Sequence, residues 1–192
     1  MKKSTVMALF LSLLFPALAF AHTGFGDTTG FLSGFGHPIG GADHVLAMVA
    51  VGLWAAQFEG RRLWAIPCTF VGVMILGGLM GFASVPVPFI EEGIVLSVLI
   101  LGVLIAGAFR FPLLVSALVV GFFAVFHGHA HGAEMPVAIG AASYTVGFAL
   151  ATALLHSAGV GLGVLIRKAN LHKVMRLAGG ALVLGGIYLV IA

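Results

Sequence analysis

Six long apolar stretches, separated by short polar or proline-containing segments, constrain this chain more than any other feature. A helix needs about 20 mainly apolar residues to cross the hydrocarbon core of a bilayer, and the stretches reach or approach that length. They do not alternate between apolar and polar residues, so they predict helices rather than the strands of a barrel. We expect spans at 42–58, 63–83, 90–109, 111–131, 137–165 and 174–192.

Composition supports an all-α integral membrane protein and excludes other classes. Hydrophobic residues make up 61 % of the chain and charged residues 8 %, whereas a soluble domain carries about 25 % charged residues. Nine Lys and Arg are too few for a phosphate-binding face, so no nucleic-acid partner is expected. The single cysteine, Cys68, excludes a disulfide framework and a Cys-x-x-Cys metal site.

The N-terminal segment has the features of a secretory signal peptide. Two lysines precede an apolar segment at 6–15, and an Ala-Phe-Ala sequence that ends at Ala21 is a suitable cleavage site. The alternative is an uncleaved first transmembrane helix, which the short apolar segment disfavours. We therefore expect a signal peptide at 1–21 and a single six-helix transmembrane domain at 22–192, whose N-terminus lies outside the cytoplasm.

The distribution of charge gives the orientation of the expected spans. Alternation from an outer N-terminus places every basic residue after the signal peptide on the cytoplasmic side, as the positive-inside rule requires. These residues are Arg61, Arg62, Arg110, Arg167, Lys168, Lys173 and Arg176. Most acids fall at the outer face, where they would concentrate cations. They are Asp27, Asp43, Glu91, Glu92 and Glu134.

Histidines outnumber acidic residues by eight to six, and five of them lie in two clusters near the outer ends of expected spans. The first cluster contains His37, Asp43 and His44. Ionisable side chains are costly next to hydrocarbon, which favours a functional role. Pro38 and the glycines that follow it disfavour a regular helix before Ala42, so we expect a turn that returns His37 towards Asp43 and His44.

The second cluster lies at the outer end of the fourth expected span. His127, His131 and Glu134 have spacings of four and three residues, so a helix places them on one face and His129 on another. Both clusters lie at the same depth on the same side. Imidazole with carboxylate suits Ni²⁺, Co²⁺, Zn²⁺ or Cu²⁺, whereas Mg²⁺ and Ca²⁺ prefer oxygen ligands. The alternative is that these side chains only cap helix ends.

Four further residues could also bind a metal by their chemistry. Three of them have two interpretations each, and the fourth has no assigned role. His156 is either a hydrogen-bonding contact between helices or a relay towards the cytoplasm, and Cys68 is either a small core residue or an inner metal ligand. His22, at the expected mature N-terminus, is either a surface residue or part of a chelate with the free α-amine. His129 receives no role.

The segments 37–48 and 126–136, which contain the two clusters, together resemble the HupE/UreJ family of small bacterial membrane proteins. The resemblance covers essentially the whole chain. It implies a nickel or cobalt permease of the inner membrane with a periplasmic N-terminus. Such a permease would supply the metal for hydrogenase or urease maturation. It also implies metal ligands at His37, Asp43, His44, His127, His131 and Glu134.

We therefore expect a transporter and not an enzyme, with Ni²⁺ or Co²⁺ as substrate, the lipid bilayer as surroundings and no permanently bound cofactor. The sequence contains no nucleotide-binding motif, so an ion gradient, the membrane potential or a partner protein would drive transport. Two alternatives keep the metal in place. One is a membrane metalloenzyme with Glu134 beside His131 as general base, and the other is a metal-sensing or assembly subunit.

Overall fold

The computed structural model describes residues 30–135 and 140–191, and within these ranges the chain is entirely helical apart from its connections. The signal peptide expected at 1–21, together with His22 and Asp27, lies outside the described residues. The helices are α2 (Gly30–Gly40), α3 (Ala42–Ala55), α4 (Arg61–Phe82), α5 (Ile90–Ala106), α6 (Leu113–Ala133), α7 (Ala141–Lys168) and α8 (His172–Ile191).

Four of these helices, α4, α6, α7 and α8, are long and apolar enough to cross a membrane, as a multi-pass membrane protein requires. α2 and α3 meet the same criterion only as a pair, which is bent by 82°. α5 has 17 residues, about 26 Å of helix, and is slightly short for a hydrocarbon core of about 30 Å. The described residues therefore contain four candidate spans, or five if the bent pair counts as one, and the sixth stays a prediction.

The segment before Ala42 differs from our expectation. We expected Pro38 and its glycines to prevent a regular helix there, but α2 is helical through Gly40 and contains Pro38. The reason is tertiary packing, because α2 runs along α7 with Gly34 in contact with the backbone of Tyr144. Such packing outweighs a low local helix propensity. The expected turn is instead a sharp bend at Gly41, between α2 and α3.

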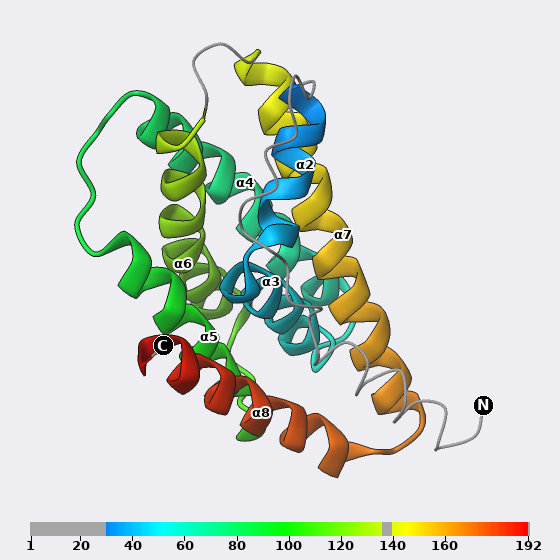
Figure 1. Ribbon diagram of the computed structural model, residues 1–192. Helices are drawn as coiled ribbons and strands as arrows, with labels where there is room; N and C mark the ends of the chain where they lie inside the picture. The colour runs from blue at the N-terminus through cyan, green and yellow to red at the C-terminus, as the bar shows by residue number, and fades with distance from the viewer. Residues whose placement is uncertain (1–29, 136–139, 192) are drawn as a thin grey trace.

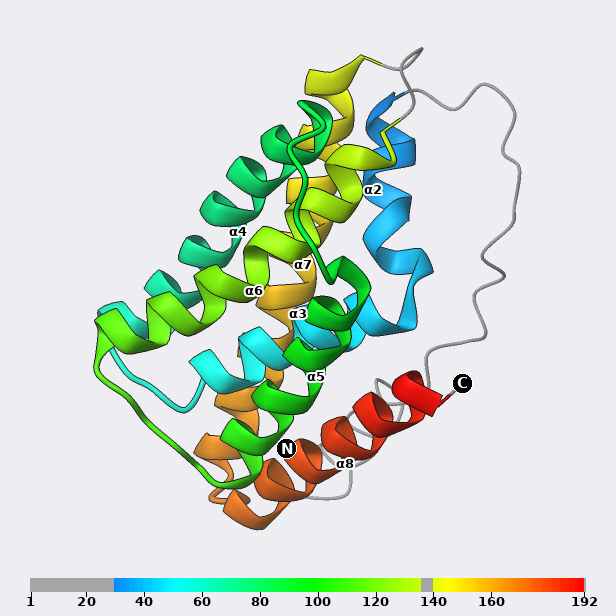
Figure 2. The same ribbon diagram turned by 90° about the vertical axis from the view of Figure 1, so that its left-hand side faces the viewer.

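Two close helix pairs form one half of the bundle: α2 with α7, and α4 with α6 (Figure 1). α5 pairs with α8, and α3 lies between the two halves in contact with α7 and α5 (Figure 2). At Gly128 of α6 a Cβ atom would overlap the carbonyl of Met74 of α4, so only glycine permits this approach.

Basic side chains gather at the end of the bundle where α3, α5 and α7 finish. Arg167 donates a hydrogen bond to the Phe58 carbonyl at 2.7 Å, and Arg176 donates one to the Ala106 carbonyl at 2.8 Å. Glu134, by contrast, lies at the C-terminal end of α6, which begins at the basic end. The two ends of the bundle thus differ in charge, and the orientation in the membrane stays a prediction.

Candidate metal centre

Four histidines from three helices form one contiguous cluster inside the bundle. His37 belongs to α2, His44 to α3, and His127 and His131 to α6. The ring centroids of His131 lie 4.5 Å from those of both His37 and His44, and the centroids of His44 and His127 lie 5.2 Å apart. The imidazoles thus follow one another in the order His37, His131, His44, His127. The two clusters of the sequence therefore form a single site.

The bend at Gly41 brings the end of α2 and the start of α3 to the same place. A Cβ atom on Gly41 would lie 2.7 Å from Oδ1 of Asp43 and 3.1 Å from Nδ1 of His44. A side chain at this position would therefore displace the carboxylate or the ring. Glycine at the bend lets α3 begin with both groups packed against the backbone.

Hydrogen bonds fix the orientation of two rings of the cluster, those of His44 and His127. Nδ1 of His44 donates to Oδ1 of Asp43 at 2.9 Å, and Nδ1 of His127 donates to the Phe123 carbonyl at 2.9 Å. Each bond places the proton on Nδ1 and leaves the Nε2 lone pair available. Carboxylates and carbonyls orient metal-binding histidines in this way.

The available nitrogens are buried without a protein partner. Within the described residues, no hydrogen-bond partner exists for Nε2 of His44, for Nε2 of His127 or for either nitrogen of His131. His127 is 0 % exposed and His131 is 2 % exposed. A buried polar group without a partner costs about 1–3 kcal/mol. The rings that carry these nitrogens lie in contact, and neutral imidazole is the chemical group that suits a late transition metal.

Glu134 and His37 form the exposed end of the cluster. Oε2 of Glu134 lies 3.0 Å from Nε2 of His37, and their side chains are 57 % and 38 % exposed. Each of Glu134, His37 and His131 offers one ligand atom, and these three atoms lie within 4.8 Å of one another. Metal–ligand bonds of about 2.1 Å require separations of at most about 4.2 Å, so a small inward movement would complete a metal site.

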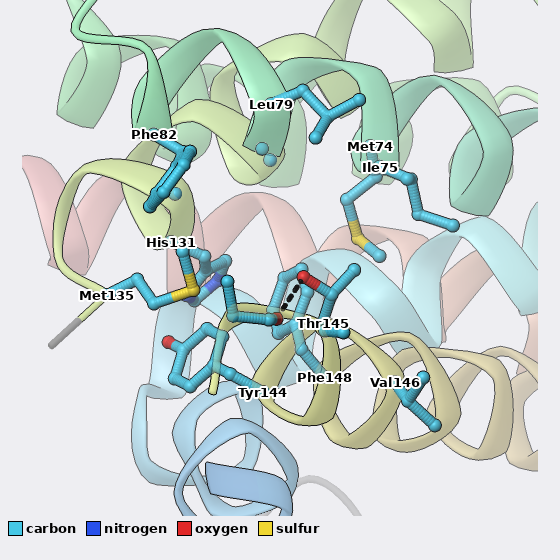
Figure 3. Close-up of a pocket in the computed structure, with 15 residues that line it drawn as sticks. Met74, Ile75, Leu79, Phe82, His131, Met135, Tyr144, Thr145, Val146 and Phe148 are labelled. Carbon is cyan, nitrogen blue, oxygen red and sulfur yellow. Dashed lines mark hydrogen bonds between the residues drawn. The ribbon is translucent and has the colours of Figure 1, made fainter. Parts of the chain in front are cut away.

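A cavity of about 440 Å³ between α4, α6 and α7 adjoins this exposed end. Figure 3 shows His131, Met135 and Tyr144 together at one side of it. The Tyr144 hydroxyl is buried and has no hydrogen-bond partner in the described part of the chain. The remaining lining is mainly apolar, and His131 is the histidine in it.

Comparison with known proteins shows to which family the sequence belongs. The profile of the family described as HupE / UreJ protein matches residues 9–189. The chain belongs to the HupE/UreJ family. Protein HupE of Rhizobium leguminosarum bv. viciae is 42 % identical over 191 residues, which cover 100 % of both chains. No solved structure matches. The family resemblance of the two histidine clusters is thereby confirmed.

An aromatic ring follows the cluster on its inner side in this HupE/UreJ protein. Phe70 of α4 is fully buried, and its ring centroid lies 5.3 Å from that of His127 and 5.0 Å from that of His156. Sequence reasoning did not single out Phe70, because one phenylalanine in an apolar helix carries no distinguishing signal. It contacts both an imidazole of the cluster and that of His156 on α7.

The remaining residues of interest in the HupE/UreJ chain lie outside the cluster. His129 points away from it, as expected from helical spacing, and donates to the Val85 carbonyl at 2.7 Å. Cys68 is exposed on α4, so its interpretation as a small core residue is wrong. Asp43 lies in the cluster as the hydrogen-bond partner of His44, and direct ligation by Asp43 stays a prediction.

Proposed function

We propose that this HupE/UreJ protein is a permease of the bacterial inner membrane that imports Ni²⁺ or Co²⁺, with the histidine cluster as its outer binding site. The observation that carries the proposal is the continuity of the cluster, from the exposed pair of Glu134 and His37 to the fully buried His127. The family name supports it, because HupE and UreJ proteins are associated with hydrogenase and urease accessory systems. Such a system would receive the imported metal.

Entry begins at the exposed end of the cluster. The carboxylate of Glu134 and the ring of His37 capture the hydrated cation and replace part of its water shell. His131 next offers two buried nitrogens without other partners, and His44 lies at the same 4.5 Å centroid distance from it as His37 does. Exchange between neighbouring imidazoles moves the ion inward, because every site is weak enough to release it.

The membrane potential is sufficient to drive this movement. An elementary charge that crosses the membrane gains about 2.3 kcal/mol per 100 mV, so a divalent cation gains about 4.6 kcal/mol. Metal-binding groups in the cytoplasm would keep the free concentration low. The proposed transport therefore needs no nucleotide hydrolysis.

A chain of sites distinguishes a permease from an enzyme or sensor with a fixed metal. A metalloenzyme holds its metal with one fixed set of protein ligands and leaves one coordination position open to the substrate. Here Glu134 pairs with His37 and lies near His131, as the enzyme alternative requires. The imidazoles continue beyond this group to the buried His44 and His127, which supports passage of the metal over retention.

Uptake of radiolabelled Ni²⁺ and Co²⁺ tests the proposal in cells that lack their own high-affinity importers. Wild type, His131→Ala and His129→Ala are compared at equal membrane abundance. His129 is the matched control, since it lies on the same helix but bonds to Val85 instead of the cluster. We expect saturable uptake that is lost in His131→Ala and kept in His129→Ala. A wild-type protein that binds metal but does not increase uptake would support the fixed-metal alternatives.

A further inference from the structure

His156 lies in a second environment, on the inner side of Phe70. It belongs to α7, its side chain is 1 % exposed, and its ring centroid lies 5.0 Å from that of Phe70. Neither ring nitrogen has a hydrogen-bond partner among the residues that the structure describes. The expected contact between helices through a hydrogen bond is therefore not seen. A buried neutral imidazole without partners can offer the lone pair of either nitrogen to a ligand.

The side chain of Cys68 lines the same space as His156. A cavity of about 460 Å³ lies between α4 and α7, and its lining contains Cys68 from the first helix and His156 and Ser157 from the second. Ser157 donates its hydroxyl to the Ala153 carbonyl at 2.7 Å. The rest of the lining is apolar. A thiol and an imidazole are thus the two strong metal-binding groups that face this cavity.

We propose that the cavity between α4 and α7 is a second transition-metal site, with His156 and Cys68 as ligands for Ni²⁺ or Co²⁺. The inference rests on the proposed function, and it assigns the next metal-binding site on the transport pathway. The ring of Phe70 contacts both His127 and His156, so the two sites adjoin one side chain. Cys68 binds as a thiolate, and its proton leaves to solvent when the metal enters.

The depth and composition of this site suit the inner half of a transport pathway. Cys68 lies seven residues after Arg61, the first residue of α4, and thus about 10 Å along the helix from its basic end. Thiolate with imidazole selects late transition metals over Mg²⁺ and Ca²⁺. Two protein ligands bind less firmly than a complete set of four, so the ion can leave for the cytoplasm.

Absorption spectroscopy of the purified full-length protein with Co²⁺ tests the site directly. The chain has one cysteine, so a thiolate-to-cobalt charge-transfer band reports Cys68 alone. We expect the band in wild type and its loss in Cys68→Ser, in His156→Ala and in His156→Gln. His129→Ala and His131→Ala should keep the band, because equilibrium binding at the inner site does not require the outer cluster.

Two results of this titration would overturn the inference. One is a wild-type protein that binds Co²⁺ through imidazole, seen in its visible spectrum, but gives no thiolate band. The other is a band that persists in both His156 variants, since Cys68 would then bind the metal without His156.

Alkylation of Cys68 supplies a test that needs no substitution of a buried residue. Cys68 is exposed, so a maleimide should react with it in the wild-type protein. We expect Co²⁺ to slow this reaction several-fold and Mg²⁺ at the same concentration to leave it unchanged; equal rates with both metals would contradict the site. The two proposals fail in different ways. A wild-type protein that gives the thiolate band but does not increase metal uptake would refute the permease alone. A wild-type protein that increases uptake but gives no thiolate band would refute the inner site alone.

Discussion

The carboxylate of Asp43 accepts two hydrogen bonds from its neighbour His44, from ring Nδ1 at 2.9 Å and from the backbone N–H at 2.8 Å. One oxygen therefore holds both the first turn of α3 and the orientation of the ring. The Nε2 lone pair of His44 is left free to face the other imidazoles. This geometry makes Asp43 the residue that orients the ring of His44.

We predict that Asp43→Asn lowers the affinity for Ni²⁺ by about 10- to 100-fold, as the loss of an orienting carboxylate does at other metal sites. An amide oxygen still accepts the Nδ1 proton but no longer supplies negative charge. Asp43→Ala should bind more weakly still, because it removes the acceptor. Calorimetric titration of the purified variants gives the order. Equal affinity of Asp43→Asn and wild type would show that the carboxylate does not orient a ligand.

A methyl group at the bend between α2 and α3 should have a similar effect. Gly41→Ala places a Cβ within 2.7 Å of the Asp43 carboxylate, so we expect weaker Ni²⁺ binding and slower uptake. The backbone itself accepts alanine, since φ of Gly41 is −102°. Gly40→Ala is the matched control, because its Cβ would meet no atom within 4 Å. Uptake at equal membrane abundance should fall only in Gly41→Ala, and an equal decrease in both would contradict the steric argument.

The similar depth of the two histidine clusters could be predicted from the sequence, and the reason is physical. Membrane spans alternate in direction, so two polar segments at the outer ends of spans must lie at similar depth. Helical spacing also separated His129 from His127 and His131, and the hydrogen bond of His129 to Val85 bears this out. These conclusions needed only element lengths and the period of a helix.

Other features of the site depend on tertiary packing that no local pattern reports. The helix at 30–40 forms in spite of Pro38, because Gly34 lies against Tyr144 of α7. Whether Cys68 faces inward or outward depends on which face of α4 meets α6 and α7. The position of Phe70 between two imidazoles arises in the same way. Each of these would require the helix–helix contacts to be known in advance.

The contact between α4 and α6 should be sensitive to a single methyl group. At Gly128 a Cβ would overlap the Met74 carbonyl, so Gly128→Ala must push the helices apart. Overpacking of this kind costs about 1–3 kcal/mol. We expect lower thermal stability in detergent for Gly128→Ala than for Gly72→Ala, whose Cβ on α4 would meet no atom within 4 Å. Equal melting temperatures would show that the helices do not pack as closely as described.

Acidification should release metal from the outer cluster, because imidazole binds a metal ion only through an unprotonated nitrogen. His37, His44, His127 and His131 lie in contact, so protonation of the cluster competes with a bound ion. We predict that the Ni²⁺ affinity of the purified protein falls as the pH is lowered. His131→Ala should weaken the affinity, whereas His129→Ala should change neither the affinity nor its pH dependence. Calorimetric titrations at a series of pH values measure both, and equal affinity of His131→Ala and wild type would exclude His131 as a ligand.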